Sequence, residues 1–182
     1  MSVFAQYGFR KATLEDIANK LYMTKSNLYL YARNKKELYR NTVSWALLRW
    51  QGRVLEAVEK ETDIRERFQV MCFKAVEYLS GDDDLRRVLI HDPDIFPVFT
   101  DKDPYQEINE NSVALIKSIL IQGIREKQFR PVDVTQVADI IFMIYKTVIV
   151  RTYIRSDEVF MRESFTEMMN LFTRGLFLDT AE

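Results

Sequence analysis

The chain has 182 residues, of which 47% are hydrophobic and 29% are charged, a balance that is typical of a folded globular protein and excludes intrinsic disorder. Its single cysteine, Cys72, cannot form an internal disulfide, and no stretch resembles a secretory signal or is apolar enough to cross a bilayer. We therefore expect a cytoplasmic protein without a membrane partner. Glycine (5) and proline (4) are scarce, which favours long helices joined by short loops.

Charge is distributed unevenly along the chain. The net charge is −1, but residues 1–53 hold ten Lys and Arg against three Asp and Glu, whereas residues 54–182 hold sixteen against twenty-four. A basic small module beside an acidic larger one indicates a polyanionic partner for the first part alone. Charged residues also cluster by chance, so this asymmetry supports a polyanionic partner only if a sequence motif in the same segment indicates one too. We expect two domains, with a boundary between residues 53 and 54.

Three helices are predicted at the N-terminal end. Thr13 followed by Asp16 is a capping-box pattern, and an apolar stripe with helical spacing follows it. Thr24 is predicted to begin a second short helix that ends near Tyr31, and Asn34 to begin a longer third helix. Four apolar residues of the first two helices are expected to face inward: Ile17, Leu21, Leu28 and Ala32.

Helical spacing continues through the rest of the chain. Further helices are predicted over residues 64–79, 85–90, 103–127 and 134–154, and a last one from Ser156 onwards. The stretch 134–154 is apolar on nearly every side, so it must be covered from several directions. The sequence thus predicts an all-α fold of about nine helices, with a three-helix N-terminal head and a larger C-terminal helical domain.

The second short helix carries the argument for DNA binding. Two short helices with a brief break between them fit a helix-turn-helix, in which the start of the second helix enters the major groove. Tyr29 and Tyr31 add hydroxyl groups suited to phosphate, and Lys35 begins a helix, where the dipole gives a cation no benefit and an external anion is a reason for it. The helix starts with side chains that can hydrogen-bond phosphates or base edges: Thr24, Lys25, Ser26 and Asn27. Each of these residues taken singly also has an ordinary structural explanation.

Four motifs follow one another in this segment: Phe4-Ala5-Gln6-Tyr7-Gly8-Phe9, Thr13-Leu14-Glu15-Asp16-Ile17-Ala18, Thr24-Lys25-Ser26-Asn27-Leu28-Tyr29-Leu30-Tyr31 and Lys35-Lys36-Glu37-Leu38. As an ensemble they resemble the signature of the TetR/AcrR family of transcriptional regulators. The resemblance implies three helices for DNA, six for ligand sensing, and a homodimer whose last two helices form a four-helix bundle. By matching position it implies DNA contacts at Thr13, Lys25, Ser26, Asn27, Tyr29, Tyr31 and Lys35.

The chain departs from the family pattern at three points. The family has most of a first helix before the position of Phe4, where this chain has three residues, so either the sequence is shortened or the first helix is a stub. Tyr22 stands where the family usually has glycine, and a positive φ there would store roughly 1–2 kcal/mol of strain. Ala32 replaces a common aromatic, so Tyr31, Tyr39 or another side chain must fill its space.

No constellation indicates catalysis or metal binding. The single histidine, His91, lies in His91-Asp92-Pro93-Asp94, which lacks regular metal-ligand spacing, and no glycine-rich phosphate loop is present. We expect neither an enzyme, nor a bound metal, nor another cofactor.

The C-terminal domain is expected to hold a ligand pocket, for which seven residues are candidates, with ordinary core packing as the alternative: Phe68, Met71, Cys72, Phe99, Tyr105, Phe142 and Tyr145. The sequence therefore predicts a homodimeric repressor that binds a near-palindromic double-stranded operator and is released by a small apolar or aromatic effector. The alternative is a helical ligand-binding or interaction protein of the same fold whose DNA-binding head is impaired by the shortened first helix and Tyr22.

Overall fold

The computed structural model describes residues 1–97, 103–154 and 158–178, and of residues 153–154 and 158–162 it describes the backbone only. Within these ranges the chain forms nine α-helices, one 3₁₀ helix and one isolated β-bridge, which confirms the predicted all-α class. The helices are α1 (Ser2–Lys11), α2 (Leu14–Lys20), α3 (Lys25–Leu28), α4 (Lys35–Glu59), α5 (Ile64–Ser80), α6 (Asp83–His91), η1 (Pro93–Ile95), α7 (Gln106–Arg125), α8 (Val134–Ile154) and α9 (Glu158–Leu176).

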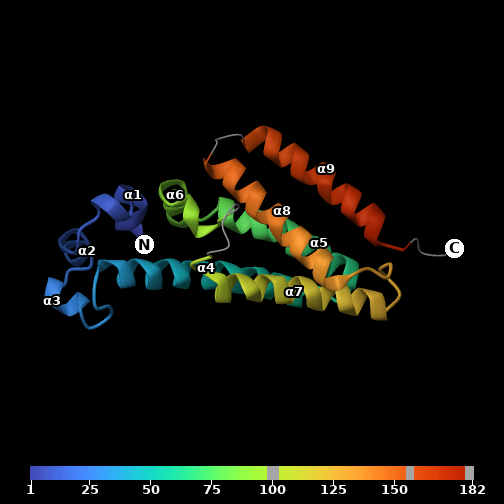
Figure 1. Cartoon of the computed structure of the whole chain (residues 1–182), viewed down its shortest axis with the longest axis horizontal. Coiled ribbons are helices and arrows are strands. Elements are labelled where there is room, and N and C mark those ends of the chain that lie inside the picture. Colours follow the sequence, from blue (N-terminus) through green and yellow to red (C-terminus); the bar gives the residue numbers. More distant parts are fainter. Residues whose placement is uncertain (98–102, 155–157, 179–182) are drawn as a thin grey trace.

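The molecule is elongated, with a small head at one end and a larger body at the other (Figure 1). Helices α1, α2 and α3 gather in the head, and α4 runs from the head along one side of the body beside α7. On the opposite side of the body α8 and α9 lie next to each other, and α6 reaches back to α1. One continuous helix, α4, therefore belongs to both parts of the molecule.

Side-chain caps determine where the first helices begin. The Asp16 amide donates to Thr13 Oγ1 at 3.0 Å while the Thr13 amide donates to Asp16 Oδ2 at 2.9 Å, so the predicted capping box is present. Thr24 caps α3, and Asn34 caps α4 by accepting from the Glu37 amide at 2.9 Å. These caps satisfy amides that have no partner inside the helix. The second short helix ends at Leu28, earlier than predicted.

Helix α1 bends at Gly8. This residue has φ 69° and ψ 167°, a region of backbone conformation that is essentially restricted to glycine. A Cβ atom built on Gly8 would lie 3.3 Å from Cγ of His91. The bend therefore lets α1 lie directly against the C-terminal end of α6, and His91 is a packing residue at this contact.

Two apolar cores fill the protein. The first joins buried residues of the head and of α4, such as Phe4 and Val43, to Leu85 and Leu89 of α6. The second lies in the body and includes Phe68 and Leu120. Because α6 contributes to the first core, that core extends across the boundary proposed between residues 53 and 54. Head and body are thus packed against each other rather than connected by a linker.

The far end of the body is closed by an aromatic contact. Phe129 and Phe177 form the isolated β-bridge, and their rings stack with centroids 5.0 Å apart. The Arg130 amide donates to the Leu176 carbonyl at 2.8 Å, which holds the end of α9 against the turn between α7 and α8. A Cβ atom on Gly123 would lie 2.1 Å from the Phe129 ring, so this close approach requires glycine.

Candidate functional site

The start of α3 and the turn after it form an exposed polar edge, which we call the recognition edge. Beneath it Leu28 is buried at 3% exposure, so the apolar side of α3 faces the core. The Thr24 hydroxyl accepts from the Asn27 amide at 3.3 Å, which fixes the first turn of the helix. The edge consists of residues that are all exposed to solvent: Thr24, Lys25, Ser26, Asn27, Tyr29 and Tyr31. The structure therefore brings together most of the residues that the sequence assigns to DNA.

The turn before the recognition edge is strained. Tyr22 adopts φ 54° and its side chain is 98% exposed. The left-handed conformation costs a non-glycine residue about 1–2 kcal/mol, and no burial of the ring offsets this. Leu21 was expected to face inward with Ile17, and this is wrong: Leu21 is 54% exposed, because α2 ends at Lys20 and the chain then leaves the helical face.

Two further residues assigned to DNA lie at the border of the head. Thr13 is exposed at the start of α2, where its hydroxyl is engaged in the capping box. Lys35 is partly buried, and its Nζ donates to the carbonyl oxygens of Arg10 at 3.3 Å and Ala12 at 2.9 Å while lying 4.7 Å from the centre of the Phe9 ring. The carbonyl groups at the end of α1 thus supply an internal reason for this cation, so an external anion is not needed to explain it.

Two polar contacts connect α4 to α6. Tyr39 is buried against Phe4, and its hydroxyl donates to Asp92 Oδ2 at 2.8 Å. Burial first and the Asp92 carboxylate second raise the pKa of Tyr39 far above its ordinary value. Nearer the body, Arg49 of α4 forms an ion pair with Asp82, the residue that caps α6. Both ends of α6 are therefore attached to α4.

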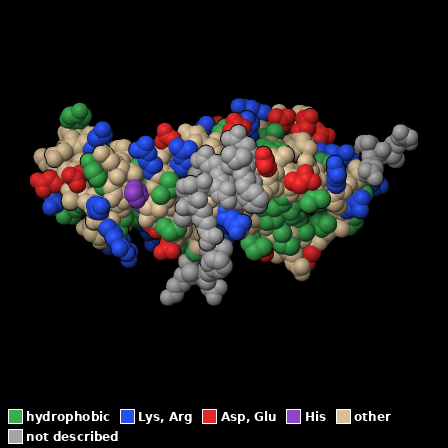
Figure 2. Space-filling view, turned by 90° about the horizontal axis from the view of Figure 1, so that it is seen from above, with side chains coloured by type: hydrophobic (Ala, Val, Ile, Leu, Met, Phe, Trp, Pro, Cys, Tyr) green, Lys and Arg blue, Asp and Glu red, His purple; other side chains and the backbone are tan. Residues whose placement is uncertain are grey.

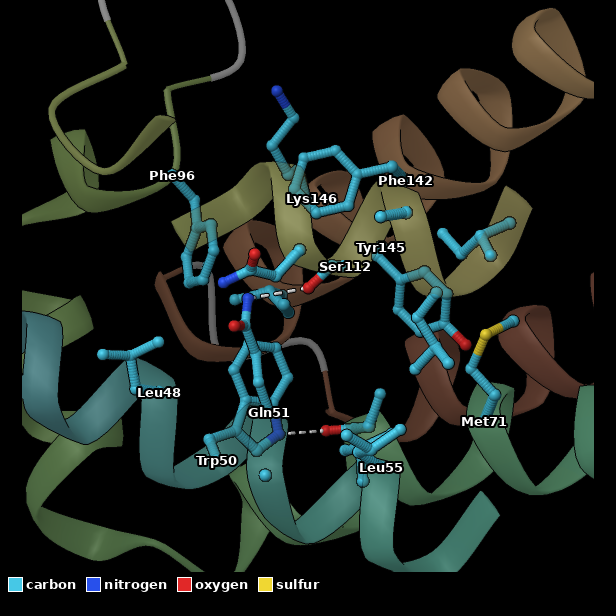
Figure 3. A pocket seen from close by; sticks show the side chains of 18 residues that line it. Leu48, Trp50, Gln51, Leu55, Met71, Phe96, Ser112, Phe142, Tyr145 and Lys146 are labelled. Atoms are coloured by element: carbon cyan, nitrogen blue, oxygen red, sulfur yellow. Dashed lines mark hydrogen bonds between the residues drawn. The ribbon is translucent and has the colours of Figure 1, made fainter. Parts of the chain in front are cut away.

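A cavity of about 410 Å³ lies inside the body between α4, α5, α7 and α8 (Figure 3). Its volume falls in the range of about 300–1,000 Å³ that small-molecule sites occupy. Most of the eighteen side chains around it are apolar. Helix α4 contributes Leu48, Gln51 and Leu55, which recur at positions i, i+3 and i+7 on one helical face.

The polar groups around the cavity are few and mostly engaged. The Trp50 indole donates to the Ala75 carbonyl at 2.9 Å. Gln51 Nε2 donates to the Ile108 carbonyl at 2.7 Å and to Ser112 Oγ at 2.8 Å, and Figure 3 shows the contact between Gln51 and Ser112 as a dashed line. These hydrogen bonds hold α4 against α5 and α7 around the cavity.

The seven predicted ligand residues separate into three groups. Met71, Phe142 and Tyr145 line the cavity. Phe68, Cys72 and Tyr105 are buried in the apolar cores and do not line it. Phe99 lies outside the described residues.

Tyr145 forms part of the cavity wall, and Cys72 lies against it on the side away from the cavity. Burial is the largest influence on both: it raises the pKa of the Cys72 thiol to about 12 and that of the Tyr145 hydroxyl well above its ordinary value. Both groups therefore stay protonated through the ordinary pH range. Cys72 is a packing residue beside the cavity.

Several cavity residues were not identified from the sequence. Lys146 on α8 is the one charged side chain among the described residues that line the cavity. By helical spacing, Leu48, Gln51 and Leu55 share one face of α4. No sequence signal showed that this face would meet α7 and α8, which lie far along the chain.

The described parts of the chain contain no group of three or more His, Cys, Asp or Glu residues that could hold a metal ion. Within the same ranges no helix combines the length and apolar character needed to span a membrane.

Comparison with known proteins agrees with these features. The profile of the family described as "Bacterial regulatory proteins, tetR family" matches residues 1–42, which include α1, α2 and α3. The uncharacterised HTH-type transcriptional regulator YhgD of Bacillus subtilis strain 168 is 20% identical over 142 residues, covering 78% of this chain and 74% of YhgD.

Solved structures share the whole fold. A TetR-family transcriptional regulator from Pectobacterium atrosepticum superposes with a TM-score of 0.79 at 16% identity, covering 97% of this chain and 89% of that chain. The regulator FadR of Bacillus subtilis in complex with stearoyl-CoA superposes with a TM-score of 0.77 at 17% identity, covering 95% and 93%. The N-terminal match, the curated relative and the solved structures agree: residues 1–42 resemble the N-terminal domain of the TetR family, and the chain as a whole shares the fold of TetR-family regulators.

Proposed function

We propose that the protein acts as a homodimeric repressor that leaves its operator when a small apolar molecule occupies the cavity in the body. The observation that carries this proposal is the course of α4. This single helix of 25 residues follows directly after the recognition edge, bears Tyr39 at its contact with α6, and lines the cavity with Leu48, Gln51 and Leu55. A change in the cavity that moves α4 therefore moves the head as well.

The recognition edge supports binding to the major groove of double-stranded DNA. In this arrangement Lys25 and Asn27 face base edges or phosphates, and Tyr29 and Tyr31 donate their hydroxyl groups to phosphate. Thr13 and Lys35 at the border of the head complete the proposed set. Lys35 contributes chiefly by donating to the carbonyl groups at the end of α1, which fixes the start of α4 against the head.

An apolar surface on α8 and α9 supports dimerisation through the last two helices. Three large apolar side chains on this surface are exposed: Ile140 and Met143 of α8 and Leu171 of α9. Figure 2 shows the face of the molecule on which α8 and α9 lie, with hydrophobic side chains gathered over the body. A second copy would cover this surface. Sedimentation at micromolar concentration tests the dimer, and a purely monomeric protein would contradict it.

A two-fold dimer predicts the form of the operator. Two recognition edges about 34–36 Å apart meet successive major grooves on one side of the duplex, so the half-sites are inverted repeats. For release, the ligand must bind the conformation that does not fit DNA more tightly than the one that does. The stearoyl-CoA bound by FadR, a protein of the same fold, supports an apolar effector for this cavity.

The DNA-binding part is tested by selecting duplexes from a random-sequence pool and titrating the selected sequence at several salt concentrations. Binding should weaken steeply with salt because phosphate contacts release counterions. Lys25→Ala and Tyr29→Ala should each weaken binding by about 1–3 kcal/mol, roughly 5- to 150-fold. Lys60→Ala, at the far end of α4, removes an equal charge away from the edge and serves as control. Equal effects of Lys25→Ala and Lys60→Ala would contradict the proposed edge.

The strained turn at Tyr22 favours one other function. If the head does not bind DNA, the protein is a helical ligand-binding or interaction protein of the same fold. The same selection separates the two functions, because this alternative yields no enriched sequence and only weak binding without sequence preference.

A further inference from the structure

We propose that the cavity binds an elongated apolar molecule that ends in a single negatively charged group, such as a carboxylate, and that Lys146 holds this group at the cavity edge. The inference rests on the ligand-binding role proposed above and specifies the chemistry of the ligand. Three observations carry it: the apolar wall, the position of Lys146, and the engagement of the other donors.

The wall requires a mostly apolar ligand. Leu55, Met71 and Ile149 come from three different helices and converge on the same space, together with the rings of Phe142 and Tyr145. Each methylene group that enters such a space adds about fourfold to the affinity. A strongly hydrated molecule would lose its water shell here without gaining hydrogen bonds.

Lys146 supplies a positive charge that no carboxylate in the described ranges neutralises. Its side chain is partly buried and runs along the cavity edge, with Nζ pointing away from Gln51 in Figure 3. Nζ donates to the Pro97 carbonyl across a long distance of 3.4 Å and lies 5.3 Å from the centre of the Phe142 ring. In the described part of the chain no carboxylate lies within ion-pair distance of it. An anion carried by the ligand would offset the cost of partly desolvating this ammonium group.

Two of the strong donors around the cavity are not available to an anion. The indole N–H of Trp50 and the amide N–H groups of Gln51 already donate to protein oxygen atoms, on Ala75 and on Ile108 and Ser112. A charged group placed beside Trp50 or Gln51 would therefore lack partners. The apolar part of the ligand belongs inside and the charged end belongs at Lys146. One lysine matches one negative charge, which favours a free acid over a conjugate with several phosphates.

Ligand titration tests this assignment. Trp50 lines the cavity, so in a Trp45→Phe background its fluorescence reports binding. The probes are decanoate, 1-decanol and decylamine, which share one chain and differ in the charge of the end group. Decanoate should bind at least about tenfold more tightly than decanol, and decylamine more weakly than both, as a charge-assisted hydrogen bond predicts. Lys146→Met should remove the advantage of decanoate and change decanol less than twofold, whereas Lys146→Arg should retain it.

Lys117→Met, which removes a lysine that does not line the cavity, is the matched control and should leave all three affinities unchanged. Equal binding of decanoate and decanol, equal losses for both in Lys146→Met, or no binding of any probe would overturn the inference. Decanoyl-CoA is a further probe, and tighter binding than decanoate would overturn the single-charge end group.

Operator DNA separates this inference from the repressor proposal. If decanoate binds through Lys146 without weakening DNA binding, the ligand assignment stands and release is wrong. If decanol or decylamine releases DNA at a lower concentration than decanoate does, the repressor proposal stands and the assignment to Lys146 is wrong.

Discussion

The recognition edge and the cavity are built in opposite ways. The edge consists of residues that lie within eight positions of one another, from Thr24 to Tyr31, on one short helix and the turn after it. The cavity is lined by residues that are as far apart as Leu48 and Ile149. The edge depends on local helix capping, whereas the cavity exists only after four helices have packed. A local sequence pattern therefore indicates the first site, and long-range packing alone creates the second.

The largest expected effect tests how firmly the core of the body is packed beside the cavity. With its pKa raised to about 12 by burial, Cys72 holds far less thiolate at pH 8 than an ordinary cysteine, whose pKa is about 8.5. Its reaction with a disulfide reagent should be more than about a thousandfold slower in the native protein than in denaturant. Fast labelling of Cys72 in the native protein would show that the body opens readily. The body would then not be the tightly packed counterpart of the exposed recognition edge.

The next effect tests the closed end of the body. Gly123→Ala places a Cβ atom where the Phe129 ring lies, 2.1 Å away, so the stack with Phe177 must move. The free energy of unfolding should fall by at least about 3 kcal/mol. Gly175→Ala is the control, since no atom lies within 4 Å of its Cβ position, and it should stabilise α9 by about 0.5–1 kcal/mol. Similar denaturation midpoints for the two variants would contradict this packing.

A third variant tests the joint between the two regions. Tyr39→Phe removes the hydroxyl that donates to Asp92 at 2.8 Å and leaves a partly buried carboxylate without this partner. The free energy of unfolding should fall by about 1.5–3 kcal/mol, as for other hydrogen bonds to charged groups. Tyr31→Phe makes the same change at an exposed ring and should alter stability by less than about 0.5 kcal/mol. An unchanged midpoint for Tyr39→Phe in urea would show that the joint depends on packing alone.

The smallest effect compares two strained turns, one in each region. Tyr22 has φ 54° in the head and Lys127 has φ 57° after α7. Replacing either residue by glycine should raise the free energy of unfolding by about 1 kcal/mol, because glycine tolerates this conformation. Neither change should alter the affinity for DNA more than twofold. A gain of tenfold or more with Tyr22→Gly would favour the alternative in which the native head binds DNA poorly.

The sequence predicted the local features of the fold well. Thr13, Thr24 and Asn34 were identified as helix caps, and each accepts the expected backbone hydrogen bond. These predictions succeed because a cap and its partner lie within one helical turn. Leu21 was misplaced because helical spacing alone does not show where a short helix ends, and α2 stops one residue before it.

Contacts between distant segments could not be predicted. Lys35 begins a helix, and only the fold shows that the end of α1 places two carbonyl groups against its ammonium. Phe68 and Met71 share the apolar character of α5, yet only Met71 reaches the cavity, because Phe68 packs against the rings of Phe129 and Phe177 at the far end of the body. Composition cannot separate a wall residue from a core residue of the same type.

Because α4 is one unbroken helix, its length determines how far the head moves when the cavity changes shape. Sixteen residues separate Lys35, beside the head, from Gln51, in the cavity wall, a distance of about 24 Å along the helix axis. A rotation of α4 by about 5° about its cavity end would move the head by about 2 Å. In a symmetric dimer the two heads would move in opposite directions. Sub-ångström repacking beside Leu48 or Leu55 therefore becomes a change of several ångströms in the spacing of the two recognition edges, which then no longer matches successive major grooves of B-form DNA.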